Sequence, residues 1–240
     1  MSKQKSQQKN KAPKEKKKPK VPAFLMAIWQ RKFLIIILAM LIALLPMAVS
    51  RQSMALTRTI LTAIGIDKDG SDIVVYGEHV LFNFDPFGIP ERHIAVGRGE
   101  TLDAALREIS VNMGRTISFS HCTLIIIGSE LYDTDLVELM QPLYDNNQLN
   151  NAAALVYTES DVETLIETSI ESGDVRSAKL QQIVEFNRTH EDKYFTSLER
   201  FFKANAREHR TAKMPVINVE GGDLQNTGDA VTFVGGILVP

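Results

Sequence analysis

Residues 124–128 read Leu-Ile-Ile-Ile-Gly, and this short apolar run decides the fold class of the chain. An unbroken apolar strand is typical of the middle of a sheet that is covered on both faces. Ile117 and Phe119 alternate with polar residues and are expected to extend this strand at its start. Helices are therefore expected on both sides of the sheet.

Amphipathic helices are predicted before and after this strand. The first begins near Thr101, has apolar residues at i, i+3, i+4, i+7 and i+11 counted from Leu102, and ends at Gly114 in the C′ position. Asp133 or Thr134 is expected to cap the second helix. These two helices provide apolar faces for packing on the sheet.

Three more helices are predicted further along the chain. Ser160-Asp-Val-Glu163 and Thr196-Ser-Leu-Glu199 have the pattern of capping boxes, in which side chains satisfy the first backbone N–H groups of a helix. Residues 175–187, which lie between the two boxes, are also expected to be helical.

Strands are predicted where β-branched or alternating segments are bounded by turn residues. Residues 59–66 and 73–84 are expected to form a hairpin, and residues 85–98, which contain two glycines and two prolines, a loop. Further strands are expected at 152–157, 214–219 and 230–239. The expected fold class is α/β (α+β), a mixed β-sheet flanked by helices and preceded by a single transmembrane helix.

The charge of the chain is unevenly distributed. Residues 1–32 contain 11 of the 27 lysines and arginines and one of the 29 acidic residues, for a net charge of +10, whereas residues 33–240 have a net charge of -12. The polar, self-repelling segment 1–32 is expected to be a disordered cytoplasmic tail. No nucleic-acid partner is expected, because no aromatic residues alternate with the lysines.

A hydrophobic segment follows the basic tail. Phe33 to Val49 contains no charged residue, and at ~1.5 Å per residue a helix of this length nearly spans a hydrocarbon core of about 30 Å. We expect a single-pass signal anchor over residues 33–50 and a linker over residues 51–57. The expected anchor side chains are Phe33, Leu34, Ile35, Ile36, Ile37, Leu38, Leu41, Ile42, Leu44 and Leu45.

The positive-inside rule gives this anchor a direction. With the basic tail in the cytoplasm, residues 58–240 form an extracytoplasmic domain at the inner membrane. A cleaved signal peptide is the alternative, since Ala48-Val49-Ser50 has small residues at the spacing that a signal peptidase needs. The length of the apolar segment and of its basic leader favours the anchor.

No catalytic, cofactor or metal site is expected from the residue pattern. His121 and Cys122 are adjacent, and neighbouring side chains of a strand point to opposite faces, so they do not form a reactive pair. The five histidines are scattered, and no CxxC or HExxH motif occurs. Cys122 is the lone cysteine and is expected to be a small buried hydrophobe.

Four stretches resemble one family of exported proteins. They are Ile60 to Asp67, Gly99 to Leu106, Gly114 to Glu130 (where Arg115, His121 and an Ile-Gly-x-Glu strand end occur in order), and Pro215 after a Ser-Leu helix start. Together they are similar to the N-terminal domain of the Ger(x)C proteins, the C subunits of spore germinant receptors. The motif residues, with structural roles expected, are Gly65, Asp67, Gly99, Thr101, Arg115, His121, Gly128, Glu130 and Pro215.

The resemblance implies a function in spore germination. It implies a non-enzymatic component that needs no cofactor and docks on the integral membrane A- and B-type subunits of a germinant receptor. The chain departs from the family in having no cysteine after its hydrophobic segment for a lipid anchor, in ending at Pro240, where further domains are expected, and in replacing an arginine-bearing stretch by Tyr144 to Asn147. The alternatives are a stand-alone anchored ligand-binding module and an unrecognised hydrolase.

Overall fold

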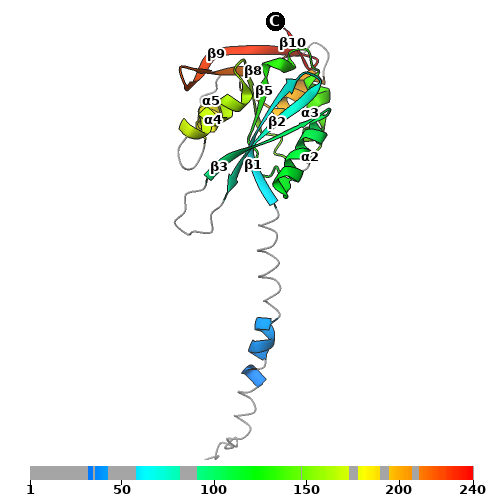
Figure 1. The fold of residues 1–240 in the computed structure, drawn as a ribbon, viewed down its shortest axis with the longest axis vertical. Helices are drawn as coiled ribbons and strands as arrows, with labels where there is room; N and C mark the ends of the chain where they lie inside the picture. The colour runs from blue at the N-terminus through cyan, green and yellow to red at the C-terminus, as the bar shows by residue number, and fades with distance from the viewer. Residues whose placement is uncertain are drawn as a thin grey trace, which may run out of the picture. The chain divides into compact units, whose positions relative to one another are not determined.

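The computed structural model describes residues 32–34, 36–42, 58–81, 91–146, 148–172, 178–189, 195–206 and 211–239. The chain divides into two units, Met1–Ser53 and Met54–Pro240. The second unit contains a ten-stranded mixed sheet with helices on both faces, as Figure 1 shows. This confirms the predicted mixed sheet flanked by helices.

The parallel strands lie in the middle of the sheet. Its order is β10-β9-β8-β6-β5-β1-β2-β3, with β4 paired to β1 and β7 paired to β6. The pairs β1–β4, β1–β5, β5–β6 and β6–β8 are parallel, and the other pairs are antiparallel. The strands are β1 (Arg58–Asp69), β2 (Asp72–Leu81), β3 (Glu91–Gly99), β4 (Thr116–Ser118), β5 (Leu124–Gly128), β6 (Ala154–Thr158), β7 (Thr196–Ser197), β8 (Thr211–Glu220), β9 (Asp223–Val234) and β10 (Ile237–Val239).

Each face of the sheet has its own hydrophobic core. Helices α2 (Leu102–Met113), α3 (Leu136–Tyr144) and α6 (Leu198–Asn205) contribute to the larger core, and α4 (Val162–Ser172) and α5 (Lys179–Thr189) contribute to the other. Figure 1 shows α2 and α3 on one side of the strands and α4 and α5 on the other. A short 3-10 helix, η1 (Ser129–Leu131), follows β5.

The predictions for the central strand and the first helix are confirmed. All five residues of β5 are buried, and β5 lies between β1 and β6. The Thr101 hydroxyl accepts a hydrogen bond from the Ala104 N–H, and Gly114 ends α2 in the left-handed conformation with φ of 60°.

The predicted loop over residues 85–98 is wrong for its second half. Glu91–Gly99 forms β3, an edge strand antiparallel to β2, while residues 82–90 lie outside the described residues. Gly97, which we interpreted as a loop signal, allows α2 to approach the sheet, because a Cβ there would overlap the Ala105 carbonyl oxygen. A glycine selected for close packing looks the same in sequence as one selected for a turn.

Several predicted element ends are displaced. Asp135 caps α3, one residue after Thr134 and two after Asp133, the two predicted caps, while Asp161 and Ser197 cap α4 and α6, each one residue later than predicted. Residues 119–123 separate β4 from β5, so neither Ile117 nor Phe119 extends the central strand. The single strand expected over residues 230–239 is two strands, β9 and β10, joined by a turn at Gly235 and Gly236, both with positive φ.

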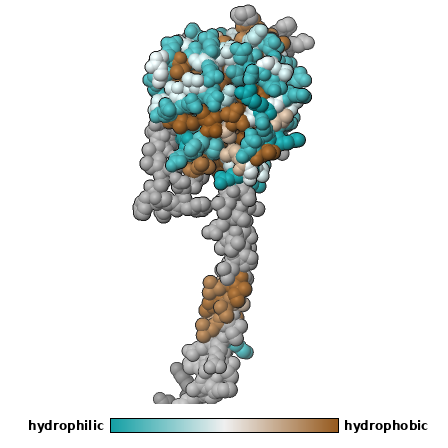
Figure 2. Space-filling view, in the orientation of Figure 1, coloured by the Kyte–Doolittle hydropathy of each residue, from teal (hydrophilic) through white to brown (hydrophobic). Residues whose placement is uncertain are grey.

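The described part of the first unit is helical at residues 32–34 and 36–42. Its large apolar side chains are exposed, for example Leu34 at 65%, and Figure 2 shows this segment as hydrophobic. Ile35, Leu44 and Leu45 of the expected anchor lie outside the described residues. Among the residues that are described, no helix combines the length and the apolar character needed to cross a membrane.

Candidate functional site

Two motif stretches meet at the carboxyl ends of β1 and β5. Ile66 pairs with Ile127, so that Asp67 lies beside Gly128. A Cβ at Gly128 would overlap the Asp67 carboxylate, which also accepts hydrogen bonds from the backbone N–H groups of Lys68, at 2.9 Å, and Glu130. The Gly-Ile-Asp turn and the Ile-Gly-x-Glu strand end are therefore parts of one contact.

The environment of Asp67 opposes its ionisation. Burial raises the pKa of the Asp67 carboxyl, and the charges of Glu130 and Asp161 add to this effect, while the two backbone hydrogen bonds lower it. Burial also raises the pKa of Tyr157 on β6, as do the nearby carboxylates of Glu159 and Asp67. Carboxylates thus gather where the parallel strands end.

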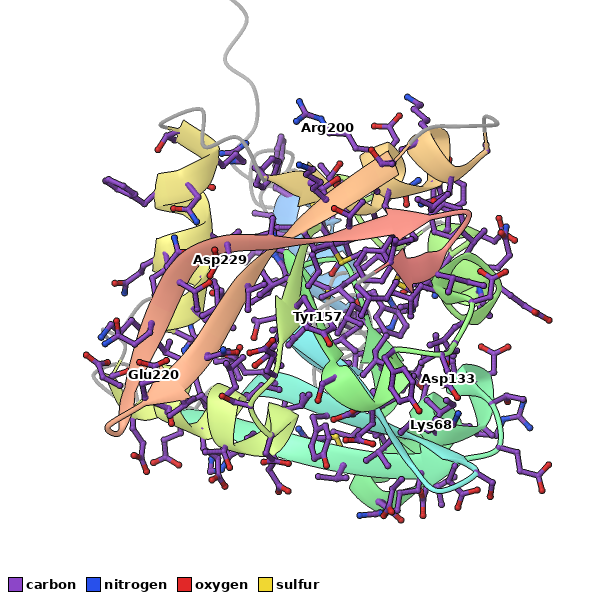
Figure 3. All side chains as sticks on the ribbon, turned by 90° about the horizontal axis from the view of Figure 1, so that it is seen from above. Lys68, Asp133, Tyr157, Arg200, Glu220 and Asp229 are labelled. Atoms are coloured by element: carbon purple, nitrogen blue, oxygen red, sulfur yellow. The ribbon has the colours of Figure 1, made fainter. Side chains whose placement is uncertain are left out.

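An ion pair lies next to this contact. The Lys68 Nζ atom is 3.3 Å from Asp133 Oδ1, and Figure 3 shows these two side chains close together, with Tyr157 nearer the middle of the domain. The ammonium of Lys68 lowers the pKa of Asp133. Because both groups are partly exposed to solvent, the pair contributes little to stability.

Gly65 lies on the same face of β1 as Asp67 and packs against α4. A Cβ at this position would overlap Val162 Cγ1 and would lie 3.0 Å from Ile166 Cδ1, both on α4. The absence of a side chain lets α4 pack directly on the strand.

The other motif residues do not join this contact. Gly99 and Thr101 fix the start of α2, where a Cβ on Gly99 would lie 2.7 Å from Ala104 Cβ. Arg115 follows the C-cap of α2 and donates its backbone N–H to the Ser110 carbonyl oxygen. Pro215 lies on β8, opposite Ala230 of β9, where the register between the two strands shifts.

His121, a motif residue for which a structural role was expected, is exposed. It lies in the turn before β5 and not in a strand. Its neighbour Cys122 is fully buried, and burial raises the pKa of this thiol to about 12. The two side chains therefore occupy different environments, although not for the predicted reason of alternation along a strand.

The other histidines are likewise dispersed. His79 is buried on β2, and its ring lies 5.9 Å from that of the exposed His93 on β3, while His190 and His209 lie outside the described residues. Burial lowers the pKa of His79. Within the described ranges, no three His, Cys, Asp or Glu side chains come close enough together to hold a metal ion.

Two surface hollows were not predicted from the sequence. One, with a volume of about 210 Å³, lies beside α5, where Arg188 and Glu185 are joined by hydrogen bonds of 2.8 and 2.5 Å. The other, of about 280 Å³, lies between α2 and α3. Only the apolar spacing of the two helices hinted at the second, and that spacing does not show how far apart they pack.

The fold is that of an α/β domain, and several of its motif residues bring neighbouring strands and helices into close contact. The family model for the spore germination protein N-terminal domain matches residues 56–219, and the chain belongs to this family. Comparison with curated proteins and with solved structures gave no match. The matched range ends within β8, so β9 and β10 lie outside it.

Proposed function

We propose that this chain is a non-enzymatic, membrane-anchored component of a spore germinant-receptor-like complex. The match of residues 56–219 to the spore germination family carries the proposal. The motif residues support it, because Gly65, Asp67 and Gly128 hold strands and helices together and do not converge on a reactive group.

Anchoring is the second part of the proposal. The uncharged segment from Phe33 to Val49 follows a segment with a net charge of +10, which favours a single pass with the tail in the cytoplasm. Exposed apolar side chains on residues 33–34 and 36–42 support a lipid environment. The domain then lies at the outer face of the inner membrane.

The proposed partners are the integral membrane A- and B-type subunits of the receptor. An anchored domain samples a small volume near the bilayer, so its local concentration around membrane partners is high and weak contacts suffice for assembly. The domain acts by recognition between protein surfaces and performs no chemistry.

Co-purification tests this function. The full chain, tagged at its N-terminus and expressed in a spore-forming host, is isolated from membranes dissolved in a mild detergent. We expect both subunit types to be recovered with it, as identified by mass spectrometry. Recovery from membranes with neither subunit would contradict the proposal.

A stand-alone ligand-binding module remains the alternative. The two hollows described above, of about 210 and 280 Å³, lie below the roughly 300–1,000 Å³ that is usual for ligand pockets. A thermal-shift screen of the full chain with amino acids and sugars separates the two ideas, since a specific ligand raises the melting temperature by mass action. We expect no specific shift.

A further inference from the structure

The groove between α2 and α3 has an apolar floor. Four apolar residues, each less than 10% exposed, line it: Leu106 of α2, Ile117 of β4, Phe119 after β4, and Leu143 of α3. Figure 1 shows the two helices on the same side of the strands. Residues of the larger hydrophobic core thus form the floor of a groove that opens to the surface.

The size of the groove fits a side chain better than a metabolite. Its volume is about 280 Å³, whereas a cavity of about 150 Å³ already holds a benzene ring. One large apolar side chain would fill much of this space and leave room for its own backbone to pass over the rim. Anchors of this kind supply most of the energy of many protein interfaces.

The rim carries an available positive charge. Arg107 is exposed, and its guanidinium has no hydrogen-bond or ion-pair partner among the described residues. Some other arginines of the domain are paired, such as Arg98 with Asp69 and Arg188 with Glu185. The guanidinium of Arg107 favours an acidic group next to it, although the net charge of residues 33–240 is -12.

An exposed apolar side chain lies next to Arg107 on the same face of α2. Val111 follows Arg107 by four residues on α2 and is 71% exposed, more than any other large hydrophobic residue recorded as exposed in the described part of the chain. Asp103, one turn before Arg107, lies in the first turn of α2, where the helix dipole favours its charge. Asp103 also lines the groove, and no ion pair joins its carboxylate to Arg107 among the described residues.

We propose that this groove docks a short segment of a partner protein that inserts one large apolar side chain and places a carboxylate against Arg107. The inference rests on the proposed function and names the face through which the domain would recognise another subunit. The apolar anchor supplies the binding energy, and the carboxylate sets the position of the segment along α2.

A peptide selection tests the groove without the receptor. Random 12-residue peptides displayed on phage are selected against the full chain in lipid nanodiscs, and enriched peptides are then synthesised and titrated. We expect peptides with an aromatic residue or Leu near an Asp or Glu. Their affinity should fall by about tenfold or more for Arg107→Glu and for Val111→Asp, two exposed positions whose substitution leaves the core intact.

A charge exchange and a matched control complete the test. Replacing the peptide carboxylate by Lys should restore binding to Arg107→Glu, while Arg188→Glu, an exposed arginine on the other helical face of the sheet, should bind the original peptide as the wild type does. Absence of an enriched motif, equal binding to Arg107→Glu, or self-association of the full chain through this groove in sedimentation would overturn the inference.

The two proposals fail separately. If both receptor subunits co-purify with the chain but no peptide depends on Arg107, the groove is not the docking surface and the proposed function stands. If peptides bind as expected but no subunit co-purifies, the groove is confirmed and the receptor assignment is wrong.

Discussion

At the scale of single residues, glycines allow the close packing of strands and helices in this domain. Gly65, Gly97 and Gly128 each lie where a Cβ would overlap a neighbour, and the neighbours are a helix side chain, a helix carbonyl and a carboxylate. Interiors are packed too closely to absorb an added methyl group without movement. Glycines at these positions are therefore required by the fold, because any side chain there would prevent the close contacts.

Gly65→Ala should lower the free energy of unfolding by about 1–3 kcal/mol, because the new methyl group overlaps Val162 Cγ1. Val162→Ala removes that atom, so the double variant should be more stable than the sum of the two single effects predicts. Urea unfolding followed by circular dichroism measures all three variants. If the effects of the two substitutions were strictly additive, the overlap with Val162 would not be the cause of the stability lost in Gly65→Ala.

Asp67→Asn should change how stability depends on pH. Because the folded pKa of Asp67 is raised, the folded state holds its proton more firmly than the unfolded state does, and the wild type loses stability as pH rises above the unfolded value of about 3.9. The variant lacks this loss, so its stability relative to the wild type should increase between pH 4 and pH 7. Urea titrations across this range measure the difference, and a constant difference would contradict the assignment.

At the scale of elements, the last two strands are part of the domain although the family match ends before them. Strand β9 pairs with almost all of β8, and Phe233 of β9 is 1% exposed in the larger core. Its ring packs edge-on against Phe201 of α6, with centroids 5.8 Å apart. The turn after β9 also contacts α3, since the Leu136 N–H donates to the Gly236 carbonyl oxygen.

Phe233→Ala should cost about 3–5 kcal/mol of unfolding free energy, the usual loss for a buried aromatic ring. The adjacent Val234 is 43% exposed, so Val234→Ala should change stability by no more than about 0.5 kcal/mol. Thermal and denaturant unfolding of this matched pair decides whether β9 completes the core. Equal effects would mean that it does not.

The elements show what could be predicted from the sequence and what could not. Local signals identified β5, the body of α2 and its two caps, because apolar runs and capping side chains act within a few residues. Strand β3 depended on its pairing with β2, whereas the division of residues 230–239 follows from the local Gly235-Gly236 turn, a hairpin signal that our prediction missed. The joining of Asp67 to Gly128 was equally hidden, since it depends on the pairing of β1 with β5.

At the scale of the whole molecule, the uneven distribution of charge predicts on which side of the membrane each part of the chain lies, and cysteine labelling can test this. The single cysteine is fully buried and its thiol pKa is raised to about 12, so it should not react with maleimides in the folded chain. Single cysteines introduced elsewhere can therefore be labelled without background.

Ser172→Cys, an exposed position at the end of α4, should react in intact cells with a maleimide that cannot cross membranes. Ser2→Cys, in the basic tail, should react only after the cells are made permeable. Gel mobility after coupling to a polyethylene glycol maleimide measures both. Protection of Ser172→Cys in intact cells would place the domain in the cytoplasm and contradict the proposed orientation.

The attachment point of the domain has a mechanical consequence. The chain enters the sheet at Arg58, the first residue of β1, and β1 is an inner strand bonded to β5 and β4 on one edge and to β2 on the other. Tension applied through residue 57 would pull β1 along its own axis, so that the hydrogen bonds on both edges resist in shear and must break together. In the proposed anchored state, a load arriving through this segment would be spread over both edges of the strand and not over one.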